Sequence, residues 1–281
     1  MRNKFLLCLL ATALLVSVSL NAQTNARPAS SMDPELQAIV QGIQNKLKAG
    51  KNTEADLAEN LVAFDALRAK HAGEKTDVVA QIVYMEAMLY QQVLNNPDKA
   101  KTLIEKLKTD YPDTKLGQKA DQMLQMMEKQ AEAKKIQSGL AAGAPFPDFN
   151  EKDLAGQPLS VGALKGKVVL VDFWATWCGP CVHELPNVIA NYQKFHAQGF
   201  EIIGVSLDSD RDKLDAFLKK TDGMIWPQFY DGQGWSNKLA VKYGVESIPF
   251  TVLVGADGNI IGTGLRGDAL GAALTKALAK K

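Results

Sequence analysis

The chain has 281 residues, of which 46% are hydrophobic, enough for one large domain or two ordinary domains with their own cores. Its formal net charge at pH 7 is +1, which excludes the large basic excess typical of a nucleic-acid-binding protein. We therefore expect no nucleic acid among its partners.

The N-terminus has the pattern of a secretory signal peptide over residues 1–22. Arg2 and Lys4 precede an apolar run from Phe5 to Leu20, and Ala22 offers a small residue at the cleavage position. We expect cleavage after Ala22 and a protein that is periplasmic or otherwise exported and is soluble once it is cleaved. An uncleaved anchor is the alternative, although the run is shorter than the ~20 residues that span a bilayer.

Residues 33–138 follow the hydrophobic period of α-helices, with apolar residues three and four positions apart. Asn96 followed by Pro97 is typical of a helix start, because the first side chain caps the helix and proline fits its first turn. The last long helix of this region is predicted from about Thr114 to Gln137. The pattern predicts an all-α domain.

The segment 81–114 resembles one tetratricopeptide (TPR) unit, so the predicted domain is built from TPR-like helical hairpins. The matching positions are Tyr84, Ala87, Ala100, Ile104 and Pro112. Met88 departs from the family, which has a small residue there. Because any antiparallel helix pair has similar stripes, two roles remain open: a scaffold or homodimerisation domain, and a peptide-binding groove.

The composition changes at 138–149, where glycine, proline and small residues interrupt the helical pattern, and we expect the domain boundary there. Residues 145–281 alternate strand and helix patterns after a hairpin that turns at Ala155-Gly156. Expected strands lie at 167–175, 200–208, 226–231 and in a hairpin at 249–266; expected helices lie at 179–198, 211–220, 237–243 and 267–281. This order predicts an α/β fold with a mixed central sheet flanked by helices.

Two cysteines, Cys178 and Cys181, form a C-x-x-C motif directly after an expected strand and at the start of an expected helix. The third cysteine, Cys8, would leave with the signal peptide. A helix N-terminus favours a thiolate, so Cys178 is the expected nucleophile, and Cys181 would then attack the mixed disulfide. Zinc needs four ligands, and only His183 is near these cysteines in sequence, so we expect no metal and no cofactor.

The stretch "FWATWCGPC" followed by "VHELP" resembles the thioredoxin superfamily, and in particular its TlpA/ResA-like branch of exported thiol–disulfide oxidoreductases. The resemblance covers about 145–281. It implies a thioredoxin-like fold with an extra N-terminal hairpin, and dithiol exchange through a redox-active disulfide between Cys178 and Cys181.

The same resemblance implies three residues that contact substrate. "SIPF" at 247–250 matches the cis-proline loop. Pro249 would lie against the nucleophilic cysteine, and the backbone of Ile248 would pair with a bound peptide. Trp177 would flank and shield the site.

Two acids lie near the cysteines, and the resemblance implies the same task for both. Thioredoxins have a buried acid at the position of Asp172, and the ResA-like branch has one at the position of Glu184. Either would accept the proton of Cys181 as that thiol attacks. Asp172 alternates with apolar residues on an expected strand, whereas Glu184 lies in the first turns of a helix, where any acid is favoured. Which of the two acts stays open.

The dipeptide Gly179-Pro180 matches that of reducing thioredoxins, without a histidine that would over-stabilise the thiolate. We therefore expect a reductase of protein disulfides that receives electrons from a membrane partner, because no dinucleotide-binding fingerprint is visible. Apocytochrome c, a copper-site protein and misoxidised proteins are all open as substrates. The alternatives are a disulfide isomerase or chaperone that uses the helical domain, and a peroxiredoxin-like peroxidase, which would need threonine in place of Ala175.

Overall fold

The computed structural model describes residues 32–279 as parts of two compact units, which divide between Glu128 and Lys129. The predicted signal peptide, 1–22, lies outside the described residues. Within 32–279, no helix is both long enough and apolar enough to cross a membrane. The division lies inside a helix rather than in the 138–149 segment, and the domain limits stay a prediction.

Three of the described helices of the first unit begin at side-chain caps. They are α2 (Pro34–Lys48), α3 (Ala58–Lys70), α4 (Asp77–Gln92), α5 (Pro97–Asp110) and the first part of α6 (Ala120–Ser138). Asp33, Thr76 and Asn96 accept hydrogen bonds from backbone N–H groups in the first turns of α2, α4 and α5. These bonds satisfy donors that have no partner inside the helix, which is why the helices begin there.

The helix that the sequence predicts from about Thr114 begins later, at Ala120, after the short 3-10 helix η1 (Gly117–Lys119). The hydroxyl of Thr114 donates to the carbonyl of Tyr111 at 2.8 Å and accepts from the N–H of Gly117 at 3.0 Å. A Cβ at Gly117 would lie 1.9 Å from the Tyr111 carbonyl oxygen. This tight turn requires glycine and delays the helix.

Residues 32–128 of the first unit enclose an apolar core and a buried ion pair. Phe64, Ile82 and Leu107 are almost completely buried in this core. Glu86 on α4 forms an ion pair with Arg68 on the neighbouring helix α3. The carboxylate of Glu86 is therefore compensated by a cation inside the same unit.

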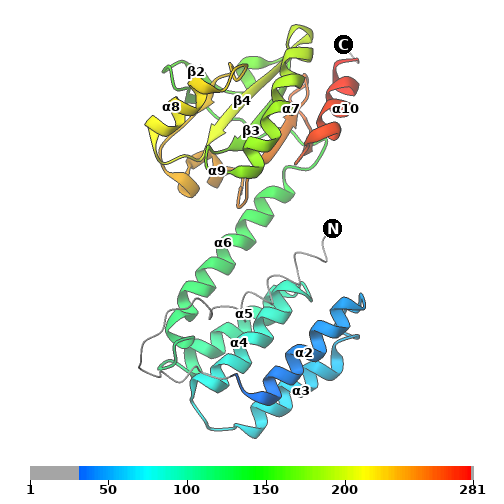
Figure 1. Ribbon diagram of the computed structural model, residues 1–281, viewed down its shortest axis with the longest axis vertical. Coiled ribbons are helices and arrows are strands. Elements are labelled where there is room, and N and C mark those ends of the chain that lie inside the picture. The colour runs from blue at the N-terminus through cyan, green and yellow to red at the C-terminus, as the bar shows by residue number, and fades with distance from the viewer. Residues whose placement is uncertain (1–31, 280–281) are drawn as a thin grey trace, which may run out of the picture. The chain divides into compact units, whose positions relative to one another are not determined.

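The second unit contains a five-stranded sheet in the order β5-β4-β3-β6-β7 (Figure 1). The strands are β3 (Val168–Trp174), β4 (Phe200–Ser206), β5 (Gln228–Phe229), β6 (Phe250–Val254) and β7 (Ile260–Thr263). Because β3 pairs parallel with β4 and antiparallel with β6, the sheet is mixed, as predicted. β5 is shorter than the strand predicted at 226–231.

Helices connect the strands of this sheet and pack against it. They are α7 (Gly179–Phe195), α8 (Arg211–Lys220), α9 (Lys238–Lys242) and α10 (Gly267–Leu278). α7 and α10 contact each other, and both also contact the sheet (Figure 1). Every residue of β3 is buried, including its one acid, Asp172. The central strand therefore carries a carboxylate into the interior of this unit.

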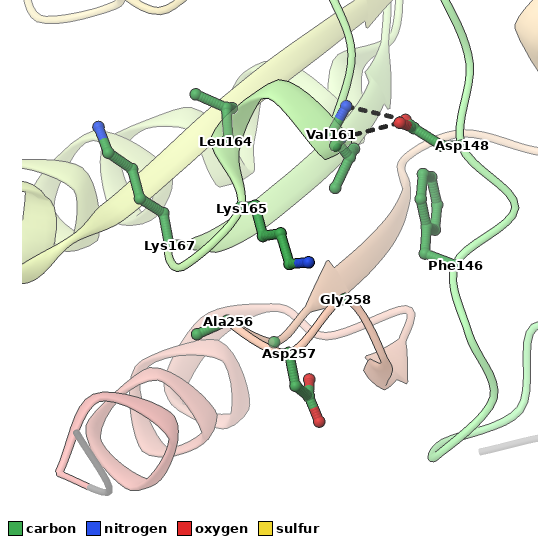
Figure 2. A pocket seen from close by; sticks show the side chains of 11 residues that line it. Phe146, Asp148, Val161, Leu164, Lys165, Lys167, Ala256, Asp257 and Gly258 are labelled. Carbon is green, nitrogen blue, oxygen red and sulfur yellow. Dashed lines mark hydrogen bonds between the residues drawn. The ribbon is translucent and has the colours of Figure 1, made fainter.

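The predicted extra hairpin is present as β1 (Glu151–Lys152) paired antiparallel with β2 (Pro158–Leu159). Asp148 anchors the chain beside it, accepting from the N–H of Val161 at 2.9 Å and of Gly162 at 2.8 Å (Figure 2). A Cβ at Gly162 would lie 2.5 Å from the Asp148 carboxylate, so this contact favours glycine. The pocket in Figure 2 lies beside the anchor, and its lining includes Phe146, Leu164, Lys165 and Asp257.

Candidate active site

The two cysteines lie where β3 ends and α7 begins. Cys178 is the N-cap residue of α7 and forms a disulfide with Cys181, with their Cα atoms 5.2 Å apart. The backbone N–H of Cys181 donates to Cys178 Sγ at 3.2 Å. Both residues are buried, at 5% and 3% exposure. When the disulfide is reduced, a sulfur at this position faces unpaired N–H groups and the positive end of the helix, which favour its thiolate form.

The peptide bond between Ile248 and Pro249 is cis, as the resemblance to thioredoxins implies. Pro249 is buried and lines a small cavity together with Cys181. Its carbonyl oxygen accepts a hydrogen bond from the guanidinium of Arg266 at 2.8 Å. Ile248 is half-buried beside it. The cis-proline loop therefore lies beside the cysteine pair and is hydrogen-bonded to a cation, Arg266.

Asp172 lines the same cavity from the central strand. Its side chain has no hydrogen-bond partner among residues 32–279, and its exposure is 5%. Burial, and after it the negative charge of Glu184, raise the pKa of Asp172 to about 7 against the opposing positive charge of Arg266. A carboxyl group that titrates near neutral pH beside Cys181 is suited to accepting and releasing a proton.

Glu184 also lines the cavity, but its carboxylate is held in a different way. Its Oε1 accepts from Asn187 Nδ2 at 2.6 Å and from the backbone N–H of Gly267 at 2.7 Å. Gly267 is the first residue of α10, and the side chain of its N-cap residue, Arg266, makes no capping bond. Glu184 therefore caps α10 from α7 and joins the two helices.

The cavity has room for about one water molecule. It brings together four residues that the sequence singles out, Asp172, Cys181, Glu184 and Pro249. It also includes Thr251, Leu265 and Arg266, which no local pattern indicates. These last residues reach the site because the hairpin of β6 and β7 returns the chain to the start of α10.

Trp177 is 54% exposed, and the centroid of its ring lies 6.0 Å from that of Trp235. Trp235, on the 3-10 helix η4 (Gly234–Ser236), is itself 49% exposed. Two exposed indole rings thus lie together on the residue that precedes Cys178 and on a neighbouring loop. Their position is compatible with the predicted flanking role, which stays a prediction.

Asp208 is a functional candidate that sequence reasoning missed. It is 2% exposed and accepts from the backbone N–H of Thr176 at 3.1 Å and from its hydroxyl at 2.6 Å. These bonds tie the segment before Cys178 to the residues that follow β4. The one signal in the sequence is that both segments follow parallel strands, whose carboxyl ends meet at one edge of a sheet.

His183 is exposed and contacts none of the groups in this cavity. Within residues 32–279, no cluster of three or more histidine, cysteine or acidic side chains is arranged to hold a metal ion. The groups that this site does bring together are the Cys178–Cys181 pair and the buried carboxyl group of Asp172.

A mixed five-stranded sheet, a C-x-x-C disulfide at a helix N-cap and a cis-proline loop beside it define a thioredoxin-fold thiol–disulfide oxidoreductase. The Redoxin family model matches residues 141–277. The thiol-disulfide oxidoreductase ResA of Bacillus cereus is 33% identical over 131 residues, which are 47% of this chain and 71% of that protein. This chain belongs to the family of these ResA-like thiol–disulfide oxidoreductases.

A second relative, the ResA of Bacillus subtilis, is 30% identical over 122 residues, so that the match spans 66% of that protein and 43% of this chain. Among solved structures, the thioredoxin domain of a thiol-disulfide oxidoreductase from Bacteroides vulgatus is 33% identical. It aligns with 49% of this chain and 97% of its own, with a TM-score of 0.45. All three likenesses cover about half of this chain or less.

Proposed function

We propose that this protein is an exported reductase of protein disulfides that works by dithiol exchange at Cys178 and Cys181. The observation that carries the proposal is the cavity in which Cys181, Asp172 and Pro249 meet directly behind the disulfide. The cavity provides a proton acceptor for the second thiol, next to the loop on which a substrate backbone would pair.

In the first step, the Cys178 thiolate of the reduced protein attacks one sulfur of a substrate disulfide. A mixed disulfide forms, and the other substrate sulfur leaves as a thiolate. The backbone N–H of Cys181, which donates to Cys178 Sγ at 3.2 Å, supports this step by favouring the attacking anion. The exposed rings of Trp177 and Trp235 and the backbone of Ile248 are the proposed contacts for the substrate chain.

In the second step, Cys181 gives its proton to Asp172 and attacks Cys178 Sγ. The disulfide between the two cysteines forms, and the remaining substrate sulfur leaves as a thiolate that takes up a proton. The substrate gains two electrons and the protein loses two. A dithiol electron donor, which we propose to be a membrane protein, must then reduce the disulfide again.

Asp172 suits the role of proton acceptor better than Glu184 does. Glu184 Oε1 already accepts two hydrogen bonds, from Asn187 and from the N–H of Gly267, and these bonds engage it in capping α10. Asp172 accepts none within the described residues, and its pKa is raised to about 7 by burial and by the charge of Glu184. We therefore assign proton transfer to Asp172 and structural support of the site to Glu184.

The dipeptide between the cysteines supports the reducing direction. Gly179-Pro180 provides no charged or histidine side chain to over-stabilise the Cys178 thiolate, and such stabilisation is what makes a dithiol protein an oxidant. A peroxidase function is not favoured. Ala175 occupies the position at which that chemistry needs threonine, and the hydroxyl of Thr176 donates instead to Asp208 at 2.6 Å.

The reduction potential of the Cys178–Cys181 pair, together with an insulin-reduction assay, tests the proposal. We expect a potential of about −230 mV or lower, in the range of reducing thioredoxin-like proteins, and insulin reduction that Cys178→Ser abolishes. The Cys181→Ser protein should accumulate the mixed disulfide, because its first step is intact. A potential near about −120 mV without insulin reduction would contradict a reductase.

The proposal also includes export and a role for the helical region, and each of these has its own test. N-terminal sequencing of the protein recovered from the producing cell should begin directly after Ala22. Light scattering tests whether residues 33–138 support a homodimer, and a stable dimer would favour the isomerase alternative over a simple reductase.

A further inference from the structure

The turn between β7 and α10, residues 264–267, contacts both the cis-proline loop and the buried acids. The guanidinium of Arg266 donates to the carbonyl of Pro249 at 2.8 Å. The next residue, Gly267, donates its N–H to Glu184 at 2.7 Å. The hydroxyl of Thr251 fixes the turn by donating to the carbonyl of Leu265 at 3.1 Å.

Arg266 also lines the cavity that contains Asp172 and Cys181. Within residues 32–279 it forms no direct ion pair with a carboxylate, and its charge acts on Asp172 through the cavity. Part of the side chain reaches solvent, while its guanidinium reaches the loop carbonyl. One residue thus places a hydrogen-bond donor on the substrate-pairing loop and a positive charge at the proton acceptor.

We infer that Arg266 is a positioning residue for the resolving step, where it holds the Pro249 carbonyl and keeps Asp172 available as a carboxylate. The inference rests on the proposed function, in which Asp172 accepts the proton of Cys181. Arginine suits this role because its planar guanidinium group stays protonated. It can donate a hydrogen bond to the carbonyl oxygen and remain a cation.

The charged groups around Asp172 define the direction of the effect. From α7 it is faced by Glu184 and Cys181, and from the start of α10 by Arg266. The strands on either side place Thr251 and Gly204 opposite Asp172, and neither of these titrates. Since Arg266 is the only cation among these neighbours within the described residues, its removal leaves burial and Glu184 unopposed and raises the pKa of Asp172 further.

Stopped-flow reaction of the reduced full-length protein with a chromogenic aromatic disulfide separates the two steps. The first released thiolate reports attack by Cys178, and the second reports attack by Cys181 on the mixed disulfide. Measuring the second phase from pH 5 to pH 9 gives a midpoint that follows the ionisation of Asp172. A purely structural residue would not move this midpoint.

We expect Arg266→Gln to raise the midpoint by about half a unit to one unit, and to slow the second phase at pH 7 by about 3- to 10-fold. Glutamine keeps an N–H donor for the Pro249 carbonyl but removes the charge. Arg266→Lys keeps the charge and should restore most of the midpoint. Lys276→Gln, which removes an exposed cation further along α10, is the matched control and should behave as the unaltered protein does.

The outcomes separate this inference from the proposed function. If Asp172→Asn abolishes the midpoint but Arg266→Gln leaves it unchanged, the role of Arg266 is overturned and the proton acceptor stands. If Asp172→Asn leaves the second phase unaltered, the proposed proton acceptor fails. A lysine variant that shifts the midpoint as far as the glutamine variant overturns the assignment of the effect to charge.

Discussion

Each of the two units of this molecule buries a carboxylate, and the two carboxylates differ in what lies beside them. Glu86 in the helical unit and Asp172 in the redox unit are both 5% exposed. Glu86 forms an ion pair with Arg68 on the neighbouring helix. Asp172 has no hydrogen-bond partner among the described residues and borders a cavity beside Cys181, where burial raises its pKa to about 7.

Burial alone therefore does not mark a chemical site. A paired acid in a core stays charged and supports the fold, because its partner compensates the loss of hydration. An unpaired acid titrates near neutral pH at the expense of stability, and such an arrangement is typical of a residue that exchanges protons. The three predictions that follow test this difference.

Removing the partnered acid should have the largest effect on folding. Glu86→Gln removes the buried partner of Arg68 and leaves it only the more exposed Asp65 as counter-ion, so we expect the free energy of unfolding to fall by about 3 kcal/mol, the low end for a broken buried pair. Both phases of dithiol exchange should keep their rates, because the redox unit holds all the reacting groups. Chemical unfolding followed by circular dichroism measures the change.

The matched control for Glu86 is Glu59, whose side chain is 90% exposed and paired with Lys46. Glu59→Gln should change the free energy of unfolding by less than about 0.5 kcal/mol. Equal losses in the two variants would mean that the buried ion pair contributes no more than a surface pair does.

Replacing the unpartnered acid, Asp172, should change the free energy of unfolding in the opposite direction. Because the pKa of Asp172 is about 7 in the fold against 3.8 for an ordinary aspartate, the folded protein binds the extra proton between these pH values. Stability due to Asp172 therefore falls as pH rises through this window. A shift of about three units corresponds to about 4 kcal/mol, of which an unbonded buried amide offsets ~1–3 kcal/mol.

At pH 8 we accordingly expect Asp172→Asn to raise the free energy of unfolding of the oxidised protein by about 2 kcal/mol. The gain should shrink as the pH falls toward 4, where both states hold the proton. Guanidinium unfolding at pH 8 and at pH 5 measures both values. A destabilised variant at pH 8 would show that the carboxylate is compensated in solution.

The sequence predicts the elements of both units well because their signals are local. Helical spacing indicates α2 to α5, a buried β-branched run indicates β3, and C-x-x-C between a strand and a helix indicates the redox site. The thioredoxin resemblance adds the cis-proline loop. The features that the sequence does not predict depend on close approaches or on long-range contacts. They are the turn between Thr114 and Gly117 before α6, the hydrogen bonds from Thr176 to Asp208, and the position of Arg266 beside the two acids.

The choice between Asp172 and Glu184 is likewise a long-range question. Both acids lie near the cysteines in sequence, and only the position of α10 shows that Glu184 is engaged by the N–H of Gly267 at 2.7 Å. No pattern within the active-site helix carries this information, since its partner is the first residue of the last helix.

The smallest effect should come from Glu184→Gln. Losing the carboxylate cap of α10 should lower the free energy of unfolding by about 0.5–1 kcal/mol. The like charge that raises the pKa of Asp172 also disappears, so the pH midpoint of the resolving phase should move down by about half a unit, opposite to the shift expected for Arg266→Gln.

Asp268→Asn is the matched control for Glu184→Gln, because it removes another acid from the first turn of α10 that does not line the cavity. It should leave the midpoint in place. A resolving phase that Glu184→Gln abolishes, rather than shifts, would make Glu184 the proton acceptor and Asp172 its support.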